Sequence, residues 1–202
     1  RDQPRSRGLG DVYKRQLRDF AFDREKLLPI TEELANLWEV TFYHRELRDG
    51  AAEMLQALKD RGYRLGVISN NASLYNVFNM LETYGIRSFM EDVTVSSVTG
   101  YRKPHPEIFR ISLRQMQVAA ENCVYVGDTV SRDIIGSKRA GFGKSVQIGS
   151  FLSAQKDAGV GAEAEGLGEH AVGELSAGDL GDAGEVVDLG RPGDLTAEAV
   201  FL

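Results

Sequence analysis

The sequence predicts an α/β fold built on a doubly wound, Rossmann-like parallel sheet. Two observations support this prediction: short strand and helix segments alternate along the chain, and the strand segments are almost continuously apolar. Strands are almost continuously apolar when helices cover both faces of their sheet. Strands with one face exposed to solvent alternate apolar and polar residues instead. The same alternation predicts right-handed crossovers between neighbouring parallel strands.

The alternating segments follow one another between residues 50 and 148. Gly62 and Gly85 come directly after the first two helical patterns and predict their ends. The expected helices cover residues 50–60, 74–84, 104–116 and 131–140. The expected strands cover residues 63–69, 93–96, 123–127 and 144–148.

The two ends of the chain differ in character from this central part. Residues 1–16 show no hydrophobic period, and residues 11–16 are what a sequencing-library adapter would encode, so we expect a foreign arm there. Residues 17–48 have helical spacing, with Thr31 as an expected N-cap. An α/β core is expected over residues 49–153. Residues 154–202 are rich in Ala, Gly and acidic residues, which predicts a weakly ordered or frame-shifted tail with short strands at 170–175 and 184–189.

Composition excludes several classes of partner. The net charge of −6 disfavours nucleic acid and anionic membrane surfaces. No apolar run reaches the roughly 18 residues of a membrane-spanning helix. Cys123 is the single cysteine, so no internal disulfide forms, and its strand position indicates a small core residue. We expect a soluble cytoplasmic protein, with its oligomeric state left open.

Three polar side chains stand at matching places in the pattern. One strand ends at Ser69, another is followed by Asp128, and Lys103 lies just before Pro104. In an open parallel sheet the carboxyl ends of the strands face one crevice. A hydroxyl, an ammonium and carboxylates meeting there suit a phosphate group and a divalent cation.

These residues resemble three of the four motifs of the haloacid dehalogenase superfamily, in the branch with a helical cap. Ser69 matches the second motif, an apolar strand that ends in Ser or Thr. Lys103 matches the third motif, a lysine that often precedes proline. Gly127, Asp128 and Asp133 match the fourth motif, an apolar strand that ends in Gly-Asp with a second Asp beyond it.

The resemblance spans residues 17–150 and implies magnesium-dependent hydrolysis of phosphate monoesters through an aspartyl-phosphate. A small phosphorylated metabolite would be the substrate, and Mg²⁺ would be the cofactor. Asp133 would either ligate the metal or orient a metal-bound water. The backbone N–H of Asn70 would add a phosphate donor. The resemblance assigns Ser69, Asn70 and Lys103 to phosphate binding, Asp128 and Asp133 to the metal, and Ser69, Lys103 and Asp128 to catalysis.

The first motif of the family, Asp-x-Asp-x-Thr after an apolar strand, is absent, since Asp19 and Asp23 have the wrong spacing. The nucleophile and the general acid are therefore missing. We expect an inactive fragment that prefers anions to Mg²⁺ and in which Lys103 has lost its partner. The central strand of the family sheet is missing too. Its neighbours are expected to close up, leave a slot or aggregate.

Other functions within and outside this superfamily fit parts of the pattern. A phosphomutase, a dehalogenase and a non-catalytic phosphate-binding Rossmann-like module are the alternatives. The family's dehalogenases lack the acid pair matched by Asp128 and Asp133, and receiver domains carry their acidic pair early in the chain. Sugar phosphates, nucleotides, glycolate phosphate and pyrophosphate remain open as substrates, because the cap carries specificity.

Overall fold

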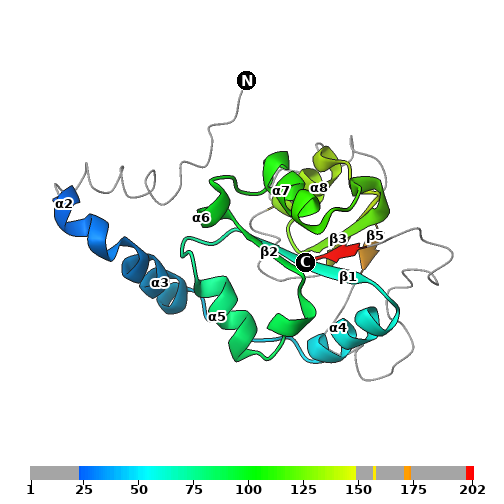
Figure 1. Ribbon diagram of the computed structural model, residues 1–202, viewed down its shortest axis with the longest axis horizontal. Helices are drawn as coiled ribbons and strands as arrows, with labels where there is room; N and C mark the ends of the chain where they lie inside the picture. The colour runs from blue at the N-terminus through cyan, green and yellow to red at the C-terminus, as the bar shows by residue number, and fades with distance from the viewer. Residues whose placement is uncertain (1–22, 149–156, 158–170, 174–198) are drawn as a thin grey trace.

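The computed structural model describes residues 23–148, 157, 171–173 and 199–202. A parallel sheet lies between two layers of helices, which confirms the predicted doubly wound α/β fold (Figure 1). The strand order is β2-β1-β6-β3-β4-β5. The strands are β1 (Arg64–Ser69), β2 (Asp92–Val95), β3 (Cys123–Gly127), β4 (Lys144–Ile148), β5 (Ala171–Gly173) and β6 (Ala199–Phe201).

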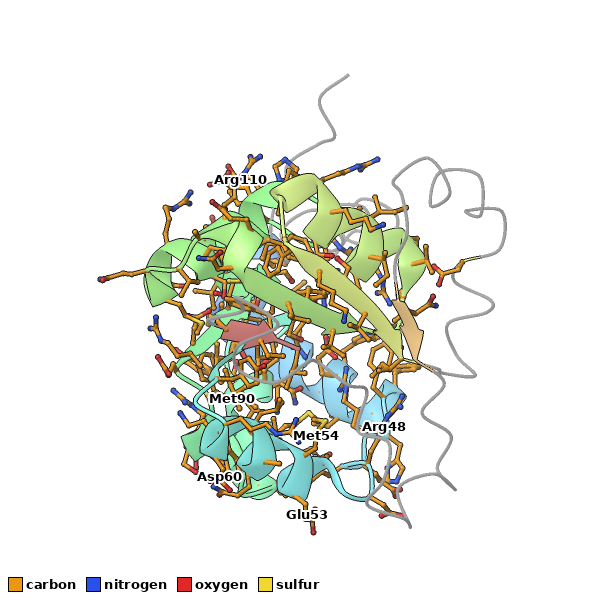
Figure 2. All side chains as sticks on the ribbon, turned by 90° about the vertical axis from the view of Figure 1, so that its right-hand side faces the viewer. Arg48, Glu53, Met54, Asp60, Met90 and Arg110 are labelled. Atoms are coloured by element: carbon orange, nitrogen blue, oxygen red, sulfur yellow. The ribbon has the colours of Figure 1, made fainter. Side chains whose placement is uncertain are left out.

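The helices cover both faces of the sheet because their apolar residues recur at helical spacing. In α4 (Ala51–Asp60), Leu55 and Leu58 are buried, Met54 packs against the same core, and Glu53 points to solvent (Figure 2). One face carries α4 (Ala51–Asp60) and α5 (Asn76–Thr83), and the other carries α7 (Pro106–Met116) and α8 (Ile135–Ala140). The short elements are α6 (Ser96–Thr99), η2 (Arg87–Phe89), η3 (Ala120–Asn122) and the π-helical η4 (Val130–Ile134).

The alternating directions of the strand residues divide the core into two clusters. Val124 belongs to the cluster under α4 and α5, whereas the next residue, Tyr125, belongs to the cluster under α7. The second cluster is rich in aromatic rings packed edge to face, with Phe109 and Tyr125 centred 5.1 Å apart. Tyr125 is thereby fixed directly beneath the carboxyl end of β3.

The centre of the sheet corrects one expectation. The neighbours of the missing first-motif strand neither close up nor leave a slot, because β6 lies between β1 and β3 and is parallel to both. Ile68 N–H donates to the Leu202 carbonyl, and Leu202 N–H donates to the Gly66 carbonyl, both at 2.9 Å. The backbone groups of the central strands are therefore paired.

Side chains also hold β6 in this central position. Val200 and Phe201 are fully buried, and each contributes about 1.5–3 kcal/mol on burial. Gly66 of the neighbouring strand leaves room for the Phe201 ring, which would lie 2.9 Å from a Cβ at that residue. The expected short strand within residues 170–175 is confirmed as β5, whereas residues 184–189 lie outside the described residues, as does the arm at 1–16.

The N-terminal segment is helical over a shorter range than predicted. Two helical stretches precede the core, α2 (Arg24–Leu27) with η1 (Leu28–Ile30) and then α3 (Thr31–Phe42), and residues 43–48 are not helical. Thr31 does not cap α3. Its hydroxyl donates instead to the Leu28 carbonyl, because η1 continues directly into the helix. Both stretches extend outward from the body of the sheet (Figure 1).

The remaining predicted elements lie within two residues of their expected bounds, except the helix expected over residues 131–140, where the π-helical η4 comes first and α8 begins at Ile135. The helix expected from Pro104 begins at Pro106, with the His105 ring accepting from Glu107 N–H as its N-cap. Within the described ranges, no helix is long and apolar enough to cross a membrane.

Candidate phosphate and metal site

The carboxyl ends of the parallel strands bring the polar residues to one edge of the sheet. β1 ends at Ser69, and β3 ends at Gly127, just before Asp128. Between these two strands lies only β6, so their ends are close neighbours at the same edge. The segment containing Lys103 joins α6 to α7 and reaches this edge from one face.

An ion pair between the partly buried Lys103 and the buried Asp133 forms the floor of the site. Lys103 Nζ lies 2.7 Å from Asp133 Oδ1, and the two side chains are 13% and 5% exposed. The Tyr125 hydroxyl accepts from Lys103 Nζ at 2.9 Å and donates to Asp133 Oδ1 at 3.2 Å. Lys103 therefore has a partner, contrary to the expectation from the missing first motif, because Asp133 supplies the opposite charge.

The side chain of Asn70 positions the main chain of Lys103. Asn70 Oδ1 accepts from Lys103 N–H at 2.8 Å, and Asn70 Nδ2 donates to the Lys103 carbonyl at 3.1 Å. This two-point contact links the end of β1 to the segment that carries the ammonium. Phosphate binding by the backbone N–H of Asn70 stays a prediction, and the contacts of its side-chain amide with Lys103 are a further role that the sequence did not indicate.

The turn after β3 holds the two acidic residues in a defined arrangement. Asp133 Oδ2 accepts from Thr129 N–H at 3.0 Å, and Asp128 Oδ1 accepts from the Thr129 hydroxyl at 2.8 Å. Gly127 is required here, since a Cβ on it would lie 2.5 Å from the Cβ of Asp133. The spacing Gly-Asp-x-x-x-x-Asp thus folds the second acid back over the glycine.

A residue from beyond the core completes this turn. Asp157 accepts from Val130 N–H at 2.8 Å and from Ser131 N–H at 2.9 Å, through its two carboxylate oxygens. These N–H groups stand at the start of η4, where a helix has no internal acceptors for its amides. Asp157 therefore anchors the segment that carries Asp128 and Asp133.

Burial and negative charge make Tyr125 a weak acid. Desolvation raises the pKa of Tyr125 well above its ordinary value, and the charge and hydrogen bond of Asp133 raise it further. Asp128 adds a smaller increase, and Arg132 opposes it. Tyr125 therefore stays protonated and keeps donating to Asp133 across the physiological range.

We expect this raised pKa to cost stability at alkaline pH. Since the unfolded state loses the tyrosine proton near pH 10 while the fold retains it, stability is complete below pH 10 and falls as the pH rises toward the folded pKa. The slope for one proton is about 1.4 kcal/mol per pH unit. In Tyr125→Phe this loss is absent, which urea unfolding between pH 8 and pH 11 measures. Tyr84→Phe, which removes a hydroxyl bonded to the Arg45 carbonyl, is the control. Parallel losses in the wild type and Tyr125→Phe contradict the prediction.

The structure brings four of the five predicted residues into one connected set. Asn70, Lys103 and Asp133 are joined by direct contacts, and Asp128 is joined to Asp133 through Thr129. The fifth, Ser69, ends β1 one residue before Asn70. Tyr125 and Asp157 were missed. Tyr125 could have been found, because it shares a strand face with Gly127 two residues on, whereas nothing in the pattern distinguishes Asp157.

The donor set fits Mg²⁺ only in part. Mg²⁺ takes oxygen ligands and is usually held by one or two carboxylates together with water and substrate phosphate. Asp128 is one such carboxylate, and its Oδ1 accepts from the Thr129 hydroxyl, while both oxygens of Asp133 accept hydrogen bonds. Among the described residues, no three His, Cys, Asp or Glu side chains form a metal-binding group.

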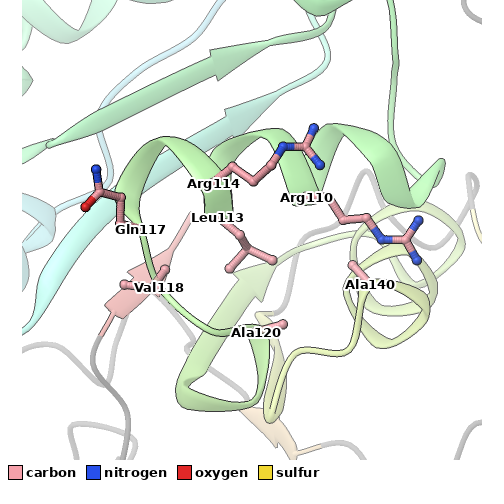
Figure 3. Close-up of a pocket in the computed structure, with 7 residues that line it drawn as sticks. All are labelled: Arg110, Leu113, Arg114, Gln117, Val118, Ala120 and Ala140. Atoms are coloured by element: carbon pink, nitrogen blue, oxygen red, sulfur yellow. The ribbon is translucent and has the colours of Figure 1, made fainter.

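A separate pocket lies away from these residues. It has a volume of about 480 Å³ and lies between α7, the segment from the end of α7 to the start of η3, and the end of α8 (Figure 3). Leu113, Val118, Ala120 and Ala140 contribute apolar groups to its lining, and Arg110 and Arg114 lie at its rim. None of the predicted site residues lines it, so it plays no part in the chemistry above.

Comparison with known proteins places the chain in a family. The model of the family described as haloacid dehalogenase-like hydrolase matches residues 9–141. The chain is 32% identical over 136 residues to the glyceraldehyde 3-phosphate phosphatase of Methanothermobacter thermautotrophicus, covering 67% of this chain and 60% of that protein. It is 33% identical over 94 residues to the phosphoglycolate phosphatase of Colwellia psychrerythraea, covering 46% and 41%. The chain thus spans 60% or less of the length of these relatives.

Solved structures share the fold. CbbY from Rhodobacter sphaeroides, solved in complex with phosphate, superposes with a TM-score of 0.59 at 21% identity, over 86% of this chain and 75% of that one. The β-phosphoglucomutase of Clostridium difficile gives 0.55 at 22% identity, over 75% and 67%. At these identities the likeness concerns the fold alone. The family match over residues 9–141, together with this fold, shows that the chain belongs to the haloacid dehalogenase-like hydrolases, a family of enzymes.

Proposed function

We propose that the site binds the phosphate group of a small phosphorylated metabolite, as part of a phosphatase. One observation supports this above all: the partly buried Lys103 ammonium lies beside Asp133 at the carboxyl edge of the sheet, 2.7 Å from its carboxylate. A partly buried ammonium fixed at a strand edge suits a ligand with several negatively charged oxygens. The relatives named as phosphatases of glyceraldehyde 3-phosphate and phosphoglycolate support the same substrate class.

Each residue has a proposed role in binding. Lys103 contacts the phosphate oxygens, and the Ser69 hydroxyl donates to one of them from the end of β1. Asn70 acts by holding the main chain of Lys103, with which it makes two hydrogen bonds. The charge neutralisation that phosphoryl transfer requires comes from Lys103 and from a metal ion.

The proposed metal is Mg²⁺, with Asp128 as its ligand. Magnesium supplies positive charge to the phosphate oxygens when it is bound. Asp133 is held by its contacts with Lys103, Tyr125 and Thr129, and its proposed role is to keep the Lys103 ammonium in position. The acid pair favours phosphoryl chemistry over dehalogenation. We also propose that residues 17–48 are the remnant of a cap that would influence the choice of substrate. The proposed place of action is the cytoplasm.

We expect the purified chain to bind phosphate without turning over phosphate esters. No residue of an Asp-x-Asp-x-Thr motif is available as nucleophile or general acid, so the covalent step has no attacking group. Hydrolysis of p-nitrophenyl phosphate, measured with and without Mg²⁺, should stay at the level of the Asp128→Asn variant. Turnover that Asp128→Asn abolishes would contradict this expectation and point to another nucleophile.

A further inference from the structure

Two carboxylates of α3 bind the loop that follows β1. This loop, residues 70–75, begins next to Ser69 and leads into α5. Glu39 is 5% exposed, and its Oε1 accepts from Ala72 N–H at 2.7 Å. Its other oxygen pairs with Arg45 at 2.6 Å. A buried carboxylate is costly unless it is paired and hydrogen-bonded, and both conditions hold here.

Glu32 makes the second contact between the same two elements. Its carboxylate accepts from Leu74 N–H, at 2.9 Å for Oε2, and from the hydroxyl of the buried Ser73. The Ser73 oxygen in turn accepts from Asn76 N–H at 3.0 Å, at the start of α5. Glu32 and Glu39 are seven residues apart, so they lie on one face of α3 and contact the loop together.

The loop connects these contacts to the proposed phosphate site. Asn70 opens the loop and holds the Lys103 main chain by two hydrogen bonds. Asn71 N–H donates to Ser96 Oγ, and Asn71 Nδ2 donates to Asn76 Oδ1, so the loop is also held from its other side. Ala72 is therefore only two residues from Asn70, whose side chain holds the main chain of Lys103, so a displacement of the backbone at Ala72 is close enough to reach that contact.

We propose that Glu32 and Glu39 are positioning residues for this site. They hold α3 against residues 72–74 and so fix the loop, and through Asn70 they fix Lys103. The link to phosphate affinity rests on the proposed function, whereas the link to the backbone of Lys103 does not. A purely structural pair would hold α3 to the core and leave Lys103 unaffected.

Amide hydrogen exchange on the full chain, resolved by NMR, tests the proposal. In Glu32→Ala and Glu39→Ala we expect the amides of Ala72, Leu74 and Lys103 to exchange about tenfold faster or more, as when one stabilising hydrogen bond is lost. Orthophosphate affinity, measured on the same proteins, should fall about threefold or more. Glu39→Gln keeps a side-chain oxygen for Ala72 N–H and should restore most of the slow exchange.

Glu33→Ala provides the control, because Glu33 is exposed on the same helix. It should change none of these quantities. If Glu39→Ala does not fold, Glu32→Ala decides, since Glu32 is only half-buried. Faster exchange at Ala72 and Leu74 with an unchanged Lys103 amide would overturn the proposal, as would unchanged exchange at Ala72. A wild-type chain that binds no orthophosphate defeats the proposed function, and the Lys103 amide then still decides the positioning role.

Discussion

Lys103→Met is expected to destabilise the fold by about 3 kcal/mol, the lower end of the cost of breaking a buried ion pair. Asp133, whose side chain is 5% exposed, loses the ammonium 2.7 Å from its Oδ1. Its remaining donors are Thr129 N–H and the Tyr125 hydroxyl, which limit the loss but carry no full charge. Methionine keeps the length of the side chain, so the change in packing is small. Urea unfolding at pH 7 measures the difference.

The matched control is a lysine in an exposed pair. Lys59 Nζ lies 3.8 Å from Glu91 Oε1, and both side chains are about one third exposed. Solvent screens such a pair, so Lys59→Met should cost less than about 1 kcal/mol. Equal losses in the two variants would mean that Lys103 and Asp133 are not held together in the folded protein.

Gly127→Ala should damage the fold and the site together. A Cβ at Gly127 would lie 2.5 Å from Asp133 Cβ and 2.7 Å from its Cγ, which no pair of such atoms tolerates. Either the β3 backbone or the turn that carries Asp133 has to move. Overpacking of this kind costs about 1–3 kcal/mol. We expect a lower thermal midpoint and, because Asp133 and Lys103 move together, weaker orthophosphate binding.

Gly62→Ala separates a backbone effect from a site effect. Gly62 has a φ of +87° and nothing within 4 Å of a Cβ, so alanine there is strained without clashing. That variant should lose about 1 kcal/mol of stability and bind orthophosphate as the wild type does. If Gly127→Ala also binds orthophosphate normally, Asp133 does not depend on the glycine as described.

Local patterns predicted the elements well where neighbouring residues decide the structure. Strands 123–127 and 144–148 have the expected bounds, because apolar runs between turn residues suffice to define them. The central strand β6 was not predicted, since an apolar run as short as Ala199–Phe201 does not distinguish a strand from other buried structure. Its position depends on a gap between β1 and β3 and on the space that Gly66 leaves for Phe201, which are tertiary features.

In the candidate site, too, local patterns indicated the residues, whereas their contacts depend on tertiary packing. Motif spacing pointed to the residue types at Ser69, Lys103 and Asp128, because each follows or precedes a recognisable element. The contacts of Lys103 with Asp133 and Tyr125 depend on how β3, its turn and the α6–α7 segment pack. In the sequence Tyr125 is one more residue of an apolar strand, and only the packing places its hydroxyl between the charged groups of Lys103 and Asp133.

Titration of orthophosphate into the intact chain by calorimetry tests the central claim most directly, namely that these residues form one phosphate site. The account predicts saturable binding of one phosphate per chain, weakened at least about tenfold in Lys103→Met and less in Ser69→Ala, as expected for a charged and a neutral donor. Saturable binding that neither substitution changes, or no saturable binding at all, would contradict it.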